Sequence, residues 1–303
     1  MMSAVVADPW AALEAVAATD QGRGSVALAD ACPGGPRRAV DLLTSGARPH
    51  LVILTGFAIP APDGGWHAET DGPLGAVQLA ECAVALGWPV RILTDVPCAG
   101  PVRAVVPPDV PVDIADLPTM TTQHACPDLI DRYDTLGVTH VVSIERVGPS
   151  PDGAPRNMRG EDISAATACL EHVVEAGPWA VVAVGDGGNE IGMGVVPQGV
   201  VERHVPAGAR VRCTVSADAL VIAGTSNWGA AAIVAGLSLR LGRRDLLAGL
   251  ADGRGRQLID RLVAAGGVDG VTRLPTPSVD GLEWPRYQAV VDELIATVDA
   301  ERA

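Results

Sequence analysis

The chain repeats an order of short apolar run, polar loop and helical segment, and this alternation constrains its fold more than any other feature. Apolar runs occupy residues 51–54, 89–93, 140–144, 179–184 and 219–223, and strand, loop and helix follow one another in this way four times. Val- and Ile-rich runs of this length are typical of parallel strands that are buried on both faces. We therefore predict an α/β fold with three layers, a mostly parallel, Rossmann-like sheet with helices on both faces.

The remaining segments fit the same architecture. Helical spacing of apolar residues predicts helices at 10–18, 73–86, 163–174, 226–241, 256–265 and 287–298. One more short strand is expected within 96–118, and the Gly- and Pro-rich residues 20–36 are expected to form a loop. With 303 residues, 48% of them hydrophobic, and no repeat or linker, we expect one domain over residues 1–303 with a sizeable core.

The charge composition excludes several kinds of function. Asp and Glu number 36 against 22 for Lys and Arg, so most of the surface would repel a nucleic-acid backbone, and we expect no nucleic-acid partner. The sequence contains no lysine at all. Schiff-base chemistry, a lysine general base and a phosphate-binding loop of the lysine type are therefore excluded.

The cysteines and the chain start indicate the compartment. The 6 cysteines form no C-x-x-C pair, and we expect reduced, mostly buried thiols. None of the 6 histidines stands in a metal-binding pattern. A basic leader and an uncharged run of roughly 18 residues are both missing, so we expect a cytoplasmic, stand-alone chain with no membrane partner. Assembly as a homodimer stays open.

A glycine-rich loop at residues 185–194, GDGGNEIGMG, follows one of the predicted strands. Its side-chain oxygens come from Asp186, Asn189 and Glu190, which suit Mg²⁺ or Mn²⁺ better than zinc. The dinucleotide-binding fingerprint fails, because Glu190 stands where its last glycine would fall. The alternative is a tight turn with solvated acids.

Other polar loops follow the predicted strands, and such loops converge at the carboxyl edge of a parallel sheet. Arg159 precedes a predicted helix and could hold a substrate carboxylate together with the helix N-terminus. In the alternative, Asp162 caps that helix and Arg159 is a surface residue. Asp71 is a metal ligand or the cap of the helix that begins near Pro73, whereas Glu69 has no such structural task and is a metal or acid-base candidate.

Two further loops carry candidates. Thr225, Ser226 and Asn227 stand at the head of a predicted helix, where N–H groups, hydroxyls and an amide could hold a carboxylate or an oxyanion. A nucleophilic Ser226 is not supported, because no G-x-S-x-G elbow surrounds it. Glu145 and Arg146 are either a mutually paired surface couple or a base and an anion ligand.

Seven segments in this order resemble the D-glutamate cyclase family domain over nearly the whole chain. They are Asp20-x-Gly22-Arg23-Gly24, Thr55-Gly56-Phe57, Glu69-Thr70-Asp71-Gly72-Pro73-x-Gly75-Ala76, Ser143-Ile144-Glu145-Arg146, Asn157-Met158-Arg159-Gly160, GDGGNEIGMG and Ser226-Asn227-Trp228-Gly229. The resemblance implies a lyase, a cyclodehydratase of the hydro-lyase class, that converts D-glutamate or a closely similar amino dicarboxylate to 5-oxo-D-proline and water. It also implies Mn²⁺ or Mg²⁺ and no organic cofactor.

The polar loops and the family resemblance together assign candidate roles to individual residues. The catalytic candidates are Asp186, Glu190, Glu69 and Glu145; the substrate-binding candidates are Arg159, Asn157, Thr225, Ser226, Asn227, Gly187 and Gly188; the metal candidates are Asp186, Asn189, Glu190 and Asp71. The expected partner is a small anionic amino acid. Two alternatives stay open: a metal-dependent hydrolase or phosphoryl-transfer enzyme on a small anionic metabolite, and a non-catalytic small-molecule-binding domain.

Overall fold

The computed structural model describes residues 8–46, 48–61, 64–117 and 126–302. Residues 1–7, on which the expectation about a leader partly rests, lie outside the described residues, as does part of the loop that follows the 51–54 run. In the described ranges, no helix has both the length and the hydrophobicity that crossing a bilayer requires.

Six parallel strands form the central sheet in the order β5-β4-β1-β6-β7-β8. In chain order they are β1 (Leu51–Thr55), β4 (Val90–Asp95), β5 (Val112–Ala115), β6 (His140–Ile144), β7 (Ala180–Gly185) and β8 (Ala219–Ile222). Alternate residues of each strand belong to different cores: Ile53 packs on one face of the sheet and Leu54 on the other. The predicted fold class, three layers around a parallel sheet, is confirmed.

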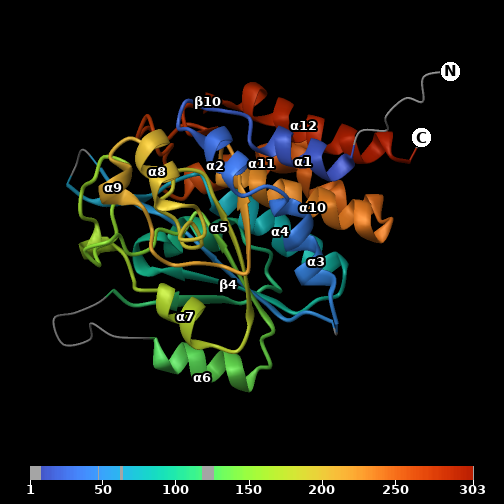
Figure 1. Cartoon of the computed structure of the whole chain (residues 1–303). Helices are drawn as coiled ribbons and strands as arrows, with labels where there is room; N and C mark the ends of the chain where they lie inside the picture. Colours follow the sequence, from blue (N-terminus) through green and yellow to red (C-terminus); the bar gives the residue numbers. More distant parts are fainter. Residues whose placement is uncertain (1–7, 47, 62–63, 118–125, 303) are drawn as a thin grey trace.

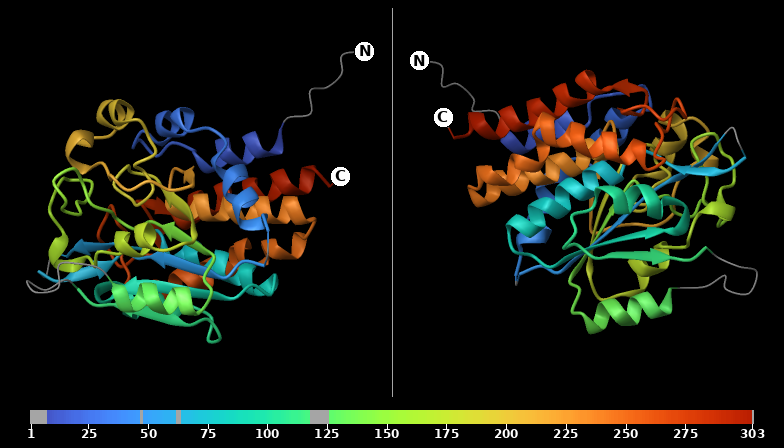
Figure 2. Two further views of the ribbon diagram at one scale, coloured as in Figure 1. Left: turned by 60° about the horizontal axis from the view of Figure 1, so that its bottom comes forward. Right: turned by 180° about the vertical axis from the view of Figure 1, so that it is seen from behind.

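Helices cover both faces of the sheet (Figures 1 and 2). One face carries the larger layer: α1 (Pro9–Ala17), α3 (Gly35–Thr44), α4 (Pro73–Ala85), α5 (Ala99–Val105), α10 (Ser226–Leu241), α11 (Asp252–Ala264) and α12 (Trp284–Ala300), with the 3-10 segments η1 (Val96–Cys98) and η3 (Arg244–Leu250). The other face carries α2 (Ser25–Ala31), α6 (Pro127–Thr135), α7 (Glu171–Ala176), α8 (Gln198–His204) and α9 (Gly208–Val211).

The strand order fixes where a ligand can bind. After β1 the chain moves to β4 and β5 on one side and then returns to place β6 on the other side of β1. Ligands of open α/β sheets bind at such a reversal, outside the carboxyl ends of the strands. Two small antiparallel hairpins complete the chain: β2 (Ala58–Pro60) with β3 (Trp66–Ala68), and β9 (Ser278–Val279) with β10 (Leu282–Glu283).

Two predictions of local structure are wrong. Residues 20–36 hold α2 and the start of α3, because Gly34 in the left-handed region and Pro36 in the first turn begin a helix instead of extending a loop. The predicted helix at 163–174 is split into η2 (Ser164–Ala166) and α7. Ala168 interrupts it, since Asp95 accepts its N–H at 3.2 Å and Arg146 donates to its carbonyl at 2.7 Å.

Candidate active site

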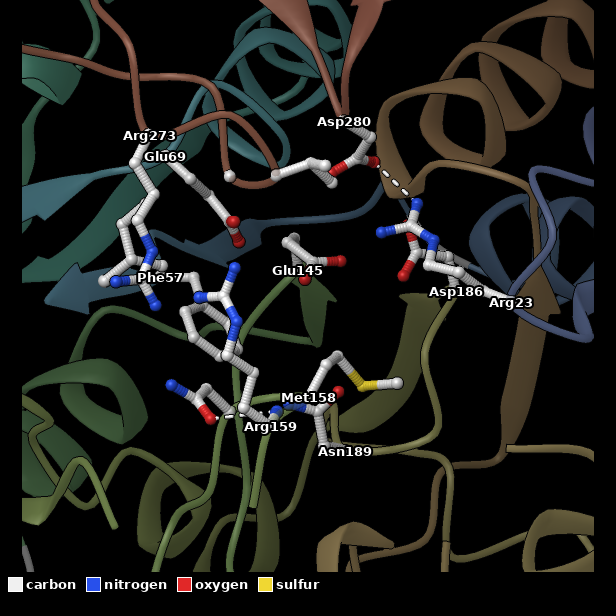
Figure 3. Close-up of a pocket in the computed structure, with 14 residues that line it drawn as sticks. Arg23, Phe57, Glu69, Glu145, Met158, Arg159, Asp186, Asn189, Arg273 and Asp280 are labelled. Carbon is white, nitrogen blue, oxygen red and sulfur yellow. Dashed lines mark hydrogen bonds and ion pairs between the residues drawn. The ribbon is translucent and has the colours of Figure 1, made fainter. Parts of the chain in front are cut away.

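A cavity lies where the loops after β1, β6 and β7 meet the two hairpin segments (Figure 3). Its empty volume is about 690 Å³, including its opening to solvent. Figure 3 shows Asp186, Arg23 and Asp280 at one side, Arg159 and Arg273 at the other, and Glu69 and Glu145 between them. The lining also includes Phe57, Ile59, Asn157, Met158, Asn189, Gly270 and Val271. One cavity thus has an acidic part and a basic part.

Asp186 begins the glycine-rich loop and pairs with an arginine from the amino-terminal part of the chain. Arg23 Nη2 lies 2.7 Å from Asp186 Oδ2 and 2.7 Å from Asp280 Oδ2. Burial raises the pKa of Asp186 well above its usual value, and the neighbouring carboxylates Glu145 and Asp280 add to this, although Arg23 opposes them. A carboxyl group in such surroundings can hold a proton near neutral pH, as acid-base catalysis requires.

Glu190 binds the backbone of its own loop. Its Oε1 accepts from the N–H groups of Asp186 at 3.0 Å and Gly187 at 2.6 Å, and its Oε2 accepts from Gly188 at 2.8 Å. The N–H groups of Gly187 and Gly188, predicted to bind substrate, are therefore engaged within the loop. Glu190 is fully buried and does not line the cavity. The alternative of a turn with solvated acids is wrong, because both acids of the loop are buried.

Glu69, at the end of the β2–β3 hairpin, faces the cavity with a free oxygen. Its carboxyl group is buried, and Oε1 has no hydrogen-bond partner among the described residues. Burial raises the pKa of Glu69 well above its usual value, and Asp280, Asp71 and Asp186 raise it further. An unpartnered carboxyl oxygen inside a cavity is available to a substrate or a cation.

Glu145 follows β6 in a conformation that residues with a side chain seldom adopt. Its φ is +47°, and such outliers cluster at functional sites. Its Oε2 accepts a hydrogen bond of 2.5 Å from Ser226 Oγ. Burial raises the pKa of Glu145 well above its usual value, and Glu190, Asp71 and Glu69 raise it further. Gly72 makes room for this residue, since a Cβ at position 72 would lie 2.7 Å from Glu145 Cβ.

Asp71 and Asn227 cap each other's helices. Asp71, just before α4, accepts from the N–H groups of Ser226 and Asn227 at the start of α10, both at 2.8 Å. Asn227 Oδ1 in turn accepts from Gly72 at 2.9 Å and Gly75 at 2.7 Å at the start of α4. The alternative in which Asp71 caps its own helix is thus wrong. Burial and Asp280 raise the pKa of Asp71 to about 8, against the opposing effect of these N–H groups.

The N-terminus of α10 already holds a carboxylate of the chain itself. Thr225 accepts from the N–H of Trp228 at 3.4 Å, and Thr225, Ser226 and Asn227 are all fully buried. None of these three lines the cavity. Their predicted use for a substrate carboxylate or an oxyanion would require Asp71 to leave this helix end.

Arg146 does not pair with Glu145. Its Nη1 lies 2.7 Å from Asp95 Oδ2 and donates to Gly56 O at 2.8 Å. The guanidinium is 1% exposed and does not line the cavity. The alternative of a surface pair is therefore wrong, and the arginine holds the ends of β1, β4 and β6 together.

Arg159 lies in the cavity wall without the helix that was predicted behind it. Asp162 accepts from Ser164 N–H at 2.9 Å, but η2 begins without a side-chain cap, so the predicted cap is wrong. Arg159 is exposed, as the alternative held, and also lines the cavity. Asn157 shapes the turn that holds Arg159: its Oδ1 accepts from the N–H of Arg159 at 3.0 Å and its Nδ2 donates to Glu161 at 2.6 Å. The Arg159 guanidinium makes no hydrogen bond or ion pair with a residue that the structure describes, and it points across the cavity (Figure 3).

Two sets of carboxylates are close enough to hold a cation. Ligand oxygens lie within 4.8 Å of one another in the set Asp71, Asp186 and Asp280 and in the set Glu145, Asp186 and Glu190. Oxygen-only sets suit Mg²⁺ or Mn²⁺. The fourth predicted ligand, Asn189, lines the cavity and donates through Nδ2 to Arg156 O at 2.8 Å. A cation would compensate the negative charge of these closely spaced buried carboxyl groups and could bind the unpartnered oxygen of Glu69. Asp186 belongs to both sets.

Sequence reasoning assigned no role to three charged residues of this cavity: Arg23, Arg273 and Asp280. Asp280 and Gly281 form the turn between β9 and β10; their φ values are +53° and +78°, as in a two-residue hairpin turn. Arg23 stands between two glycines, which in a chain without lysine was a usable signal for a site cation.

Fold and site together define an α/β protein of the doubly wound class, with a cavity lined by both acidic and basic side chains. A family model described as D-glutamate cyclase-like, C-terminal, matches residues 13–295. The chain belongs to this family. It is 34% identical over 182 residues to "D-glutamate cyclase, mitochondrial" of Homo sapiens. That alignment covers 56% of this chain and 29% of the human protein, so the chain matches less than a third of that relative.

Proposed function

We propose that this protein is a lyase that closes D-glutamate, or a closely similar amino dicarboxylate, to 5-oxo-D-proline with loss of water. The observation that carries the proposal is the cavity in which the unpaired Arg159 faces the free carboxyl oxygen of Glu69. Membership of the D-glutamate cyclase-like family supports the same reaction.

The charges of the cavity complement such a substrate. Arg159, with Arg273 beside it, offers guanidinium groups to the α-carboxylate, and paired N–H donors of this kind bind carboxylates with defined orientation. Arg273 forms a long ion pair with Glu161, in which its Nη2 lies 3.9 Å from the carboxylate, so its guanidinium group can also bind a substrate. The ammonium group would then face Glu145 and Asp186 at the acidic side.

Ring closure requires two proton transfers for which the chain has carboxyl groups in reach. Glu145, which already accepts from Ser226, would take one proton from the ammonium group, which frees the amine for attack on the γ-carboxyl carbon, and a second proton from the nitrogen after the attack. Glu69, whose pKa burial raises well above its usual value, would give the departing oxygen the two protons that make it water, and would itself regain protons from Glu145. The substrate loses one water molecule, and nothing is oxidised or reduced.

Asp186, with Asp71 and Asp280 or with Glu145, is the residue that would hold Mn²⁺ or Mg²⁺. When bound, the cation would supply positive charge for the γ-carboxyl group. Arg23 would keep Asp186 and Asp280 oriented toward the cavity, since it contacts both.

The alternative of a phosphoryl-transfer enzyme has less support. A phosphate cradle needs free backbone N–H groups. Those of Asp186, Gly187 and Gly188 are all directed at Glu190. A non-catalytic binding domain would share the cavity but form no product, and the experiment below separates the two.

The test is to incubate the purified protein with D- or L-glutamate, with and without Mn²⁺, and to measure 5-oxoproline by mass spectrometry. We expect product from D-glutamate and more of it with Mn²⁺. Absence of product from both enantiomers would exclude the proposed reaction.

Two variants test the site. Glu69→Gln removes the proposed acid, and Asp186→Asn removes the carboxylate that is common to both cation sets. We expect each to lower the rate by about 100-fold or more, the usual contribution of an acid-base group. Glu202→Gln, an exposed change on α8, is the matched control and should retain full activity. Unchanged rates in both site variants would mean that the reaction occurs elsewhere.

A further inference from the structure

A second group of metal-ligating side chains lies where the amino-terminal end of α7 meets α6. The Sγ of Cys169, a carboxylate oxygen of Glu171 and a ring nitrogen of His172 all lie within 4.8 Å of one another. All three side chains are partly exposed, and none lines the acidic cavity. This group is therefore separate from the candidate active site and is accessible to an ion from solvent.

A second cysteine lies on the neighbouring element. Cys126 is the residue that precedes α6, and α6 lies beside α7 in both figures. It does not belong to the group whose ligand atoms lie within 4.8 Å of one another. The site therefore has one thiol, one carboxylate and one imidazole from the described residues, which leaves a fourth position to water.

The ligand chemistry differs from that of the acidic cavity. Thiolates and imidazole select zinc and similar cations, whereas carboxylates alone suit Mg²⁺ or Mn²⁺. One thiol, one imidazole and one carboxylate are three protein ligands, the number that zinc takes in open sites, where water holds the fourth position.

We propose that Cys169, Glu171 and His172 form a binding site for a thiophilic divalent cation of the zinc class. The site would fix the start of α7, which begins at Glu171. Neither its ligands nor its metal class depends on the reaction proposed above.

Co²⁺ is the probe that tests this site, because thiolate ligation gives a sulfur-to-cobalt charge-transfer band in the near ultraviolet. The reduced, chelator-treated full chain is titrated with CoCl₂ and then with ZnCl₂. We expect the charge-transfer band together with the intense visible bands of tetrahedral cobalt, and loss of both as zinc replaces cobalt. Absence of the charge-transfer band would overturn the proposal.

Variants assign the ligands. Cys169→Ser should remove the charge-transfer band, because Cys169 provides the thiol of the proposed site. His172→Ala should weaken Co²⁺ binding at least about tenfold. Cys32→Ser, another partly exposed cysteine, is the matched control and should leave the spectrum unchanged. A full band in Cys169→Ser would also overturn the proposal, and Asp186→Asn keeps the band if the two metal sites are separate.

Discussion

Replacing Glu190 with glutamine separates a structural role of this residue from a role in holding metal. The carboxylate accepts three N–H groups, from residues 186, 187 and 188, at 2.6 to 3.0 Å. In its best orientation, glutamine keeps the two bonds to Oε1 but turns an amide NH₂ toward the Gly188 N–H. One buried donor then loses its acceptor, at a cost of about 1–3 kcal/mol, and the other two bonds lose their charge assistance.

We expect the free energy of unfolding of Glu190→Gln to fall by about 2–4 kcal/mol. With a urea m-value of about 3 kcal/mol/M, the midpoint should fall by about 1 M. Urea unfolding followed by circular dichroism measures this, and Glu202→Gln, on the exposed side of α8, should stay within about 0.5 kcal/mol of the unaltered protein. An unchanged midpoint combined with loss of Mn²⁺ binding, measured by calorimetry, would refute the reasoning and make Glu190 primarily a metal ligand.

Three further predictions concern pH, substrate affinity and helix capping. The pKa of Asp71 is raised from 3.8 to about 8, so the folded state binds this proton more tightly than the unfolded chain. The free energy of unfolding should therefore fall as the pH rises across that interval. Urea midpoints that rise with pH instead would contradict this. Arg159→Gln should raise KM for D-glutamate about 10- to 100-fold with little change in kcat, as expected for loss of about 1.5–3 kcal/mol of charge-assisted binding. The exposed, uninvolved Arg286→Gln should change neither constant, and an equal loss of kcat in Arg159→Gln would argue for a role in the chemical step. Asn227→Ala leaves two buried N–H groups and one carbonyl without partners and should cost about 3–5 kcal/mol by urea unfolding; a loss below about 1 kcal/mol would mean that water replaces the cap.

The strands of the sheet could be predicted because each is defined by the pattern of a few consecutive residues. Runs such as residues 51–54, Leu-Val-Ile-Leu, are apolar throughout, and a strand with both faces buried accounts for that over so short a length. The missed α2 and the broken helix before α7 depend on distant partners. Ala168 leaves helical geometry because Asp95 and Arg146, from other strands, bind its backbone.

The site was predicted in part for the same reason. Glu145 and Asp186 directly follow β6 and β7, so topology alone brings them to one edge of the sheet, where Glu69 and Arg159 join them from connecting loops. Arg23 and Asp280 reach the cavity from the two ends of the chain. No local sequence pattern predicts that Arg23 pairs with Asp280 and Asp186.

Whether a helix N-terminus is free also could not be predicted from its own sequence. Ser226 and Asn227 have the residue types of an anion site, and the anion that they bind is Asp71, from a loop that is distant in the chain. Glu190 is comparable, since the spacing within its loop does not reveal whether its carboxylate faces outward or back onto the loop.

The exchanged caps of α4 and α10 have a consequence for how the chain folds. Each helix start obtains its hydrogen-bond acceptor from the opposite half of the chain, so neither half can complete its own helix before the two halves dock. The amide protons of Gly72, Gly75, Ser226 and Asn227 should therefore exchange with solvent only when the whole sheet opens, at one shared free energy. Docking of the halves and completion of the acidic cavity would then be a single cooperative event.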